Sequence, residues 1–479
     1  MSLPIFWKRS ARHIRQSRIY WGCALRVILL CVLGVCALSL RGQSPALLGP
    51  PGAKVINLTH HAGYFNEPSI AVNPREPQEL VAAFQTGARI AYSRDLGEHW
   101  ELASGTEPRN YAVSGDVSVA YDNRGHAFLC YIAFDKLGTE NYWGHNATRN
   151  GIFVRRSPDG GKTWQREDVP VIEHPTRPGI PFEDKPYIVA DNTRGPYAGR
   201  LYVGWTEFSL TQSIILFSRS EDDGATWSGP LRISTQAGLP RDDNGAVEGF
   251  TGAVGPDGTV YAVWADGTHV VFTSSRDGGR SFSPSRAIID IAPPYFHITG
   301  VDRTDGFPVI AIDPHGAKGA GILYLAWSDY RNGDVDIFCS TSRDRGLTWT
   351  PEVRVNSDPL HNGADQFFQW LAVDPVSGAA NLVFYDRRRD PANRKTFIVL
   401  ARSTDDGKTF QNYAWTRKEF DPDQDFLGDY TGIAAYHGRV YGVWAEERPR
   451  SGSRRDGGPA HHTIVRLGIA DFESPSNTR

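Results

Sequence analysis

The stretch Ser220-Glu221-Asp222-Asp223-Gly224-Ala225-Thr226-Trp227 contains the pattern that decides the fold. The pattern reads Ser-x-Asp-x-Gly-x-Thr/Ser-Trp/Phe, and it occurs six times, ending at Trp100, Trp164, Trp227, Phe282, Trp349 and Phe410. The first copy departs from it only at His99. Neighbouring copies end 55 to 67 residues apart, and a recurrence of this size predicts one supersecondary unit per repeat in a solenoid or ring.

Each copy has the composition of a turn that follows a strand. Apolar, often β-branched runs such as 214–217 and 397–400 precede it. The Asp carboxylate can accept backbone N–H groups of the turn, Gly fits where φ is positive, and the closing aromatic ring can pack under a neighbouring sheet. Six near-identical copies therefore indicate a structural role rather than a catalytic one.

A second repeat precedes each of these turns, and it consists of an apolar strand, a polar turn and a second apolar strand. It occurs seven times, for example at 69–74, 308–314 and 371–375. Together with the strands on either side of the Asp turn, it predicts four antiparallel strands per unit. We therefore predict an all-β fold, a seven-bladed β-propeller over residues 53–471, with six blades as the alternative.

The seventh unit lacks an Asp turn and a fourth strand of its own. Residues 54–58 can supply that strand by pairing with the strand around 463–467. Such pairing would close the ring and remove an exposed sheet edge.

The N-terminal residues have a different composition. A basic segment with Lys8, Arg9, Arg12, Arg15 and Arg18 precedes an apolar run over 27–40. This order is typical of a signal peptide, so we predict that residues 1–44 are a signal peptide with a short linker and that the protein is secreted or periplasmic. The alternative is a membrane anchor over residues 20–40, close to the ~20 residues that span a bilayer.

Partner classes follow from charge and from the rest of the chain. The net charge of −3 gives no overall attraction to nucleic acid, so no nucleic-acid partner is expected. Membrane contact is expected only through the N-terminal segment. Residues 472–479 form a C-terminal tail, and we expect a monomer.

Acidic residues precede the first strand of every predicted blade. In a four-stranded antiparallel blade, these connections share one face with the second-to-third-strand connections, opposite the Asp turns. The connections on this face are longer and more polar than the Asp turns, so we predict that the pocket lies on this face. The acids are Glu67, Asp116, Asp184, Glu248, Asp305, Asp365 and Asp429. They could cap strand starts, supply acid/base groups or hold calcium, whose ligands are oxygens; we expect no other cofactor and assign no metal ligands.

Three arginines follow the second strands of the last three predicted blades. They are Arg331, Arg388 and Arg448, in the segments 327–331, 384–388 and 444–448. Three guanidinium groups on adjacent blades would bind a carboxylate or sulfate, because each offers a planar fork of donors. The alternative is that each arginine pairs with an acid of its own blade.

The repeated phrase resembles the Asp box, or BNR repeat, of the sialidase (neuraminidase) superfamily. The segments 183–186, 384–388 and 427–430 resemble secreted bacterial sialidase-like proteins more closely. The resemblance implies a β-propeller whose arginine triad binds the substrate carboxylate, with a Tyr nucleophile paired with a Glu and an Asp acid/base. The first arginine of that triad normally stands in an Arg-Ile-Pro motif, whereas this chain reads Asn66-Glu67-Pro68-Ser69 at that place.

Two functions are therefore carried forward. The first is an exported glycan-active enzyme that hydrolyses an acidic-sugar glycoside, with Tyr430 as nucleophile and Asp429, Asp386 or Glu248 as acid/base. Its substrate-binding residues are Arg331, Arg388, Arg448, Asp184, Lys185 and Glu67. The second is a non-catalytic propeller that binds a glycan or a protein on the same face.

Overall fold

The structure is a computed structural model that describes residues 46–473. Within this range it leaves out residues 62, 137–146, 176–180, 241–244, 293–296, 302, 305, 317, 318, 320, 423–425 and 448–462. The chain divides into two units, 1–45 and 46–479, and all described residues belong to the second. The predicted signal segment therefore lies outside the described residues. None of the described residues forms a helix long and apolar enough to cross a membrane.

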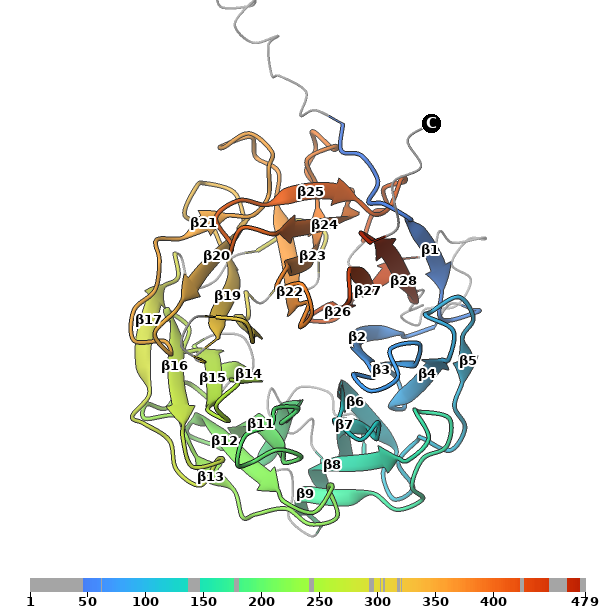
Figure 1. Ribbon diagram of the computed structural model, residues 1–479, viewed down its shortest axis with the longest axis vertical. Helices are drawn as coiled ribbons and strands as arrows, with labels where there is room; N and C mark the ends of the chain where they lie inside the picture. The colour runs from blue at the N-terminus through green and yellow to red at the C-terminus, as the bar shows by residue number, and fades with distance from the viewer. Residues whose placement is uncertain are drawn as a thin grey trace, which may run out of the picture. The chain divides into compact units, whose positions relative to one another are not determined.

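Seven four-stranded antiparallel sheets surround a central axis (Figure 1), which confirms the predicted seven-bladed propeller. Blades one to three consist of β2 (Asn66–Val72), β3 (Leu80–Gln85), β4 (Arg89–Ser93) and β5 (Glu101–Leu102); β6 (Val113–Tyr121), β7 (Ala127–Phe134), β8 (Asn150–Ser157) and β9 (Val169–His174); and β10 (Phe182–Ala190), β11 (Leu201–Phe208), β12 (Ser213–Ser220) and β13 (Leu231–Arg232).

Blades four to six repeat this order. Their strands are β14 (Glu248–Val254), β15 (Val260–Ala265), β16 (His269–Ser275) and β17 (Arg286–Asp290); β18 (Val309–Asp313), β19 (Ile322–Asp329), β20 (Asp336–Ser342) and β21 (Val353–Arg354); and β22 (Gln366–Val373), β23 (Ala380–Asp386), β24 (Phe397–Ser403) and β25 (Gln411–Ala414).

Blade seven is built from both ends of the propeller. It contains β26 (Gly432–Tyr436), β27 (Arg439–Glu447) and β28 (Thr463–Asp471), and β1 (Lys54–Asn57) supplies its fourth strand. Residues 54–57 pair with 469–466, and the Leu58 N–H donates to the Val465 carbonyl at 2.9 Å. The predicted closure of the ring is confirmed. Because β1 covers β28, that strand leaves no free edge in its sheet.

The Asp turns hold themselves together through side-chain hydrogen bonds. In blade three the Asp222 carboxylate accepts the Thr226 N–H at 2.9 Å, the Thr226 hydroxyl at 2.6 Å and the Ser220 hydroxyl at 2.8 Å, and the Gly224 N–H donates to Ser220 Oγ. The other five copies repeat the bonds that their Ser and Asp accept from the turn backbone. Burial alone would raise the pKa of Asp222, but these hydrogen bonds outweigh it and lower that pKa.

The core lies between neighbouring blades. The aromatic residue that closes each Asp turn packs with strands of its own and the preceding blade, as Trp349 does with Phe272 and Leu323. The turn glycine touches the same surface: Gly346 has a φ of 79°, and a Cβ there would lie 2.2 Å from Phe272 Cζ. The predicted anchoring role of the aromatic residue is confirmed.

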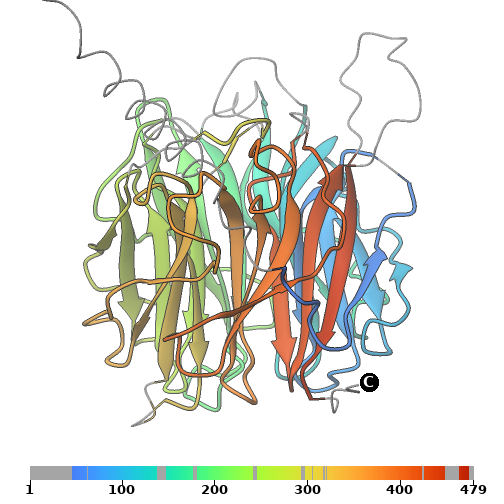
Figure 2. The same cartoon turned by 90° about the horizontal axis from the view of Figure 1, so that it is seen from above.

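The first strand of each blade is innermost, and each contacts the first strand of the next blade around the axis. The strands run between two faces of the propeller (Figure 2). The turns between first and second strands lie on the same face as the Asp turns, since Arg124 of one forms an ion pair with Asp223 of the other. The opposite face carries the starts of the innermost strands, and we call it the site face.

Candidate functional site

The innermost strands share one irregularity near the site face. In blades one, two, three, four and six the pairing register shifts at the same place, which leaves a β-bulge. The first bulged residue has a positive φ in every case: Glu67, Asp116, Lys185, Gly249 and Phe368. Four of these are not glycine, and left-handed backbone at such residues is uncommon and is enriched at functional sites. We call these positions, with Phe307 and Tyr430 at the corresponding places of blades five and seven, the axial ring.

Lys185 lies at the centre of the axial ring. Its side chain is 7 % exposed, and its Nζ lies 4.2 Å from the Phe307 ring centroid and 4.1 Å from that of Tyr430. Among the described residues Nζ has no hydrogen-bond partner. Burial alone would lower the pKa of Lys185, but four nearby carboxylates raise it, so the ammonium group stays charged. These carboxylates belong to Asp429, Asp116, Glu67 and Glu248.

Gly249 makes room for this arrangement. Its φ is 79°, and a Cβ on it would lie 2.2 Å from Cδ1 of Phe307. The ring of Phe307 therefore occupies the space that a side chain of blade four would take. As a result Phe307 reaches Lys185, and the ammonium is covered by two aromatic faces.

Glu67 is the most deeply buried acid of the axial ring, at 1 % exposed. Its Oε1 accepts the N–H of Asp429 at 3.3 Å, and Oε2 has no hydrogen-bond partner among the described residues. Burial raises the pKa of Glu67 well above its ordinary value, and the charges of Asp116 and Asp429 raise it further. A protonated Glu67 would have an O–H donor at Oε2 that no described protein group accepts.

Asp429 has the opposite environment, because Arg303 pairs with it. Arg303 Nε donates to Oδ1 of Asp429 at 2.7 Å, and Nη2 bonds the other carboxylate oxygen. The guanidinium group also lies over the Phe426 ring, 5.2 Å from its centroid. Tyr64, which precedes β2 of blade one, stacks on the same Phe426 ring. The Arg303 side chain is 34 % exposed and that of Asp429 is 5 % exposed, so the guanidinium group is the part of this pair that reaches the solvent.

Arg303 reaches blade seven because the connection between β17 and β18 crosses the site face. Ile298 and Val301 of this connection are buried with Phe368 and Leu427, from blades six and seven. The crossing brings a cation to the acids of the axis. We use the name funnel for the group of residues formed by Arg303, Asp116, Asp184 and the axial ring.

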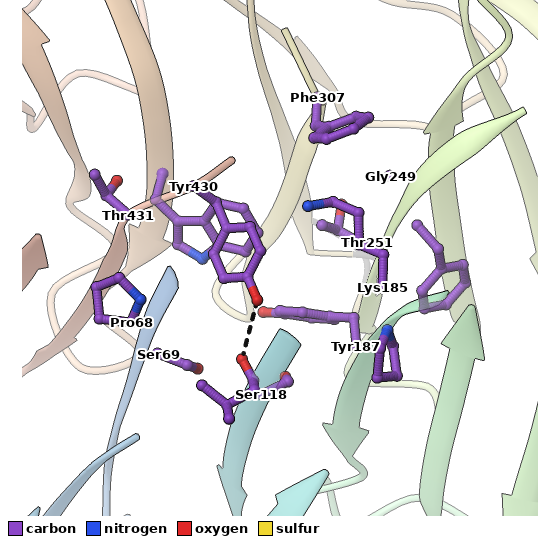
Figure 3. Close-up of a pocket in the computed structure, with 14 residues that line it drawn as sticks. Pro68, Ser69, Ser118, Lys185, Tyr187, Gly249, Thr251, Phe307, Tyr430 and Thr431 are labelled. Carbon is purple, nitrogen blue, oxygen red and sulfur yellow. Dashed lines mark hydrogen bonds between the residues drawn. The ribbon is translucent and has the colours of Figure 1, made fainter. Parts of the chain in front are cut away.

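A cavity lies just below Lys185, toward the interior of the propeller (Figure 3). Its volume is about 20 Å³, enough for roughly one water molecule. Lys185, Tyr187, Trp370 and Tyr430 line it. It is too small for a sugar.

Tyr430 points into this cavity rather than toward the solvent. Its hydroxyl donates to the Val117 carbonyl at 3.5 Å (Figure 3). Burial raises the pKa of Tyr430 well above its ordinary value, and the charges of Glu67, Asp116 and Asp429 act in the same direction. This environment disfavours the phenolate that a tyrosine nucleophile requires.

The structure brings several predicted site residues together. Glu67, Asp184, Lys185, Glu248, Asp429 and Tyr430 are coupled electrostatically around the axis. Asp116, from the same set of strand-start acids, joins them and accepts the Lys185 N–H at 3.2 Å. Asp184 also accepts that N–H, at 3.0 Å.

The predicted arginines have other surroundings. Arg331 pairs with Asp329 and Glu352, and it donates to the Asp290 carbonyl of β17. Arg388 pairs with Asp386 at 2.7 Å and donates to Asn412 of β25. Asp329 and Asp386 end the second strands of blades five and six, so each of these two arginines pairs with an acid of its own blade, the alternative left open by the sequence. Arg448 lies outside the described residues, as does Asp305.

Asp386 is buried beside Arg388, away from the axial ring. Burial raises its pKa, while Arg388 acts in the opposite direction. Asp365 is likewise engaged outside the funnel, where it accepts the Asn393 amide at 2.5 Å and the Val335 N–H at 3.0 Å. Among the described residues, no group of three or more His, Cys, Asp and Glu side chains is arranged to hold a metal ion.

Sequence reasoning missed Arg303, Phe307 and Gly249. One signal could have identified Phe307: the axial-ring residues Glu67, Lys185 and Phe307 are each followed by proline. Proline has no N–H for the ladder, so it is tolerated at a bulge. Arg303 has no such signal, because its position depends on the path of the whole connection.

No protein-family model matches the sequence. A curated sialidase from Bacteroides fragilis (strain YCH46) is 25 % identical over 287 residues, which cover 54 % of this chain and 48 % of that protein. The match thus spans about half the length of this relative. Among solved structures, the leech intramolecular trans-sialidase aligns with a TM-score of 0.47 and 13 % identity, covering 81 % of this chain and 71 % of the leech chain. An ulvan lyase, a polysaccharide lyase, aligns with 0.48 and 11 %, covering 87 % and 96 %.

The chain is a seven-bladed β-propeller with six Asp turns, and about half of it is similar in sequence to a curated sialidase. The fold alone does not assign an activity.

Proposed function

We propose that this protein acts on a glycan bound in the funnel and hydrolyses a glycosidic bond there, with Glu67 as the general acid. One observation carries the proposal. The Glu67 carboxyl accepts the backbone N–H of Asp429, and burial together with nearby carboxylates raises its pKa, whereas the neighbouring Asp429 carboxylate is paired with Arg303. Two neighbouring acids in such different environments are typical of acid/base catalysis.

The chemistry follows from these protonation states. Glu67 gives its proton to the oxygen of the leaving sugar, the bond between that oxygen and the anomeric carbon breaks, and its electron pair stays on the oxygen. Water adds to the anomeric carbon and gives up a proton to a carboxylate of the funnel, which restores the balance of charge. The carboxylates of Asp429 and Asp116 also stabilise the positive charge that develops at the anomeric carbon.

Lys185 supports this chemistry without touching the sugar. Its ammonium belongs to the axial ring and offsets the charges of nearby carboxylates. The match to a curated sialidase supports a carbohydrate ligand, and the 25 % identity over half of that protein's length leaves its substrate open for this chain.

The experiment is a screen of fluorogenic glycosides that carry acidic, neutral and amino sugars, with wild type, Glu67→Gln and Glu107→Gln. Glu107 is exposed on the surface, so its variant is the matched control for loss of one carboxyl group. We expect Glu67→Gln to bind glycans but lose at least about a hundredfold in kcat, the usual contribution of a general acid. Full turnover by Glu67→Gln would refute the role of Glu67.

A second function is a propeller that binds a glycan without cleaving it. The environment of Tyr430 favours this alternative, because its hydroxyl donates to Val117 and its phenol is held protonated. Saturable binding to a glycan array with no release of sugar from any glycoside would select it.

We also propose that the protein is exported. The basic N-terminal segment followed by the apolar run over 27–40 supports this. Cell fractionation with an antibody to the propeller tests it: a full-length chain in the soluble cytosolic fraction would contradict export, and a cleaved chain outside the cytoplasm is expected.

A further inference from the structure

We propose that a groove between the Asp turns of blades four and five binds the carboxylate or sulfate group of an acidic saccharide. Residues of both turns, 275–282 and 342–349, line this groove, so it belongs to the face opposite the site face. It is a second binding site, separate from the funnel. That a saccharide carries the anion rests on the proposed glycan function, whereas the site for the anion itself does not.

The groove is a cavity whose lining is basic. Its volume is about 600 Å³, within the range of roughly 300–1,000 Å³ that is usual for small-molecule pockets. Three guanidinium groups line it, those of Arg276, Arg286 and Arg345. Asp277 is the acid among the lining residues, and its carboxylate already accepts the N–H and the hydroxyl of Ser281. The lining therefore favours a negatively charged ligand.

Comparison of the six Asp turns shows what is unusual at this place. The fourth residue of the repeated phrase has a φ between 62° and 74° in every copy. It is Gly or Asp in four copies and Leu96 in the first copy. In blade five it is Arg345, a residue type that is uncommon in left-handed backbone.

An Asp at this fourth position pairs with an arginine of the preceding blade. Asp406 of blade six pairs with Arg343 of blade five at 2.6 Å, and Asp223 of blade three pairs likewise with an arginine of blade two. Arg343 is the second residue of its phrase, and Arg276 is the equivalent residue of blade four. On the blade that follows Arg276, however, the fourth position is occupied by Arg345 instead of an acid.

The groove thus contains guanidinium groups that share no acid. Among the described residues, the Arg276 guanidinium forms no hydrogen bond or ion pair. Arg345 donates through Nε to Asp257 at 2.9 Å, and its Nη atoms have no described partner. Arg286 donates through Nη2 to the Gly346 carbonyl, which holds this side chain at the groove. An oxyanion bound here would take the role of the carboxylate that other junctions supply.

The rest of the lining suits a sugar ring. Phe282, Pro284 and Leu347 contribute apolar surface, and Leu347 is 69 % exposed. A free sulfate would leave this surface and most of the groove unused, whereas a saccharide has C–H faces beside its charged group. The combination of guanidinium forks with apolar surface therefore favours an acidic saccharide.

Calorimetric titration with three probes tests the inference: the galacturonic acid tetramer, its methyl-esterified form and inorganic sulfate. Esterification removes the charges and keeps the sugar rings. We expect the acid tetramer to bind wild type at least about tenfold more tightly than the ester, the factor given by about 1.4 kcal/mol. Sulfate should bind more weakly than the acid tetramer, because it makes no contact with the apolar surface.

Three variants locate the effect. Arg276→Gln removes one guanidinium charge, and Arg345→Asp places an acid where blade six has Asp406. Both should abolish the preference for the acid tetramer over the ester. Arg343→Gln is the matched control and should keep the preference, because Arg343 holds the equivalent position in blade five but pairs with Asp406. Thermal melts of all variants separate a lost site from a lost fold.

The results can overturn either the groove or its ligand. A preference that persists in Arg276→Gln and Arg345→Asp would overturn the groove as the anion site, as would equal binding of acid and ester by wild type. Failure of the folded protein to bind the acid tetramer would overturn it as well. Sulfate binding as tight as that of the acid tetramer would overturn the saccharide as the ligand.

Turnover of fluorogenic glycosides tests the proposed function separately, and Arg276→Gln should leave its rate at the wild-type value. Turnover without arginine-dependent binding of the tetramer would overturn the groove alone. Arginine-dependent binding without turnover of any glycoside would overturn the proposed hydrolysis and support the groove.

Discussion

Replacement of Lys185 by methionine tests whether one buried ammonium holds the axial carboxylates together. Methionine keeps most of the apolar stem but removes the charge. In the native protein this charge lies among Asp429, Asp116, Glu67 and Glu248, and the side chain is 7 % exposed. The variant would leave these acids with Arg303 as their remaining described counter-charge.

The magnitude follows from burial. Removing one partner of a buried charge cluster costs about 3–5 kcal/mol, because the remaining charges are uncompensated. The loss of two desolvated cation–π contacts, to Phe307 and Tyr430, is contained within that range. We therefore expect the free energy of unfolding, measured by urea titration near neutral pH, to fall by about 3–5 kcal/mol.

Lys54→Met is the matched control. Lys54 pairs with Glu98 at 2.6 Å, but the two side chains are 52 % and 42 % exposed. Such a surface pair contributes less than about 1 kcal/mol. The same substitution at a buried and an exposed lysine thus separates the effect of burial from the effect of removing a lysine.

The pH dependence gives a second criterion. Without Lys185, the pKa of Glu67 rises further above that of the unfolded chain. A carboxyl group with a raised folded-state pKa destabilises the fold increasingly as pH rises from the unfolded-state pKa to the folded-state pKa, so the loss in Lys185→Met should be largest at neutral pH and shrink toward about pH 5. A loss equal to that of Lys54→Met, or one independent of pH, would refute the electrostatic role of Lys185.

Three further predictions concern the rest of the propeller. Asp222→Ala should lower the free energy of unfolding by about 1–3 kcal/mol, because it leaves turn N–H groups unpaired. The folded variant should keep its glycan binding. A stable variant that has lost binding would contradict a purely structural role of the turn. Burial and the charge of Glu183 raise the pKa of Glu207 from 4.5 to about 7. Wild type should therefore lose stability as pH rises from 4.5 to 7, and Glu207→Gln should abolish that loss, on the order of 1 kcal/mol after screening. Ile56→Pro should break the ladder between β1 and β28 and lower the urea midpoint, unless ring closure contributes nothing to stability.

The propeller could be predicted because its information is local and repeated. Each Asp turn is eight residues long, and its hydrogen bonds join residues two to four apart, such as Ser220, Asp222 and Thr226. A local pattern of this kind can be read from the chain, and its spacing then gives the number of units. The missing turn of blade seven also identified β1 as the closing strand.

The site could be predicted only in part, because its contacts are distant in sequence. Glu67 and Asp429 are 362 residues apart, and Arg303 and Asp429 are 126 apart. The acids were found because they recur at equivalent strand starts. Arg331 and Arg388 also recur at equivalent places, yet their blades supply Asp329 and Asp386 as partners within two residues. Recurrence therefore identifies equivalent positions but does not reveal whether a side chain reaches the axis.

The axial ring explains why Lys185 is closer to the charges of the other blades than Arg331 or Arg388. Its residues come from the innermost strands, so a charge there lies close to every blade, whereas an arginine at the end of a second strand lies beside its own sheet. The β-bulges reinforce this arrangement, because Glu67, Asp116 and Lys185 all have a positive φ and therefore occupy equivalent positions in three blades. A substitution at one of these positions changes the field felt by all the others, as the shared carboxylates around Lys185 and Tyr430 indicate. Exchanging Asp116 for asparagine should therefore change the environment of both Lys185 and Tyr430, although Asp116 belongs to none of the repeated phrases.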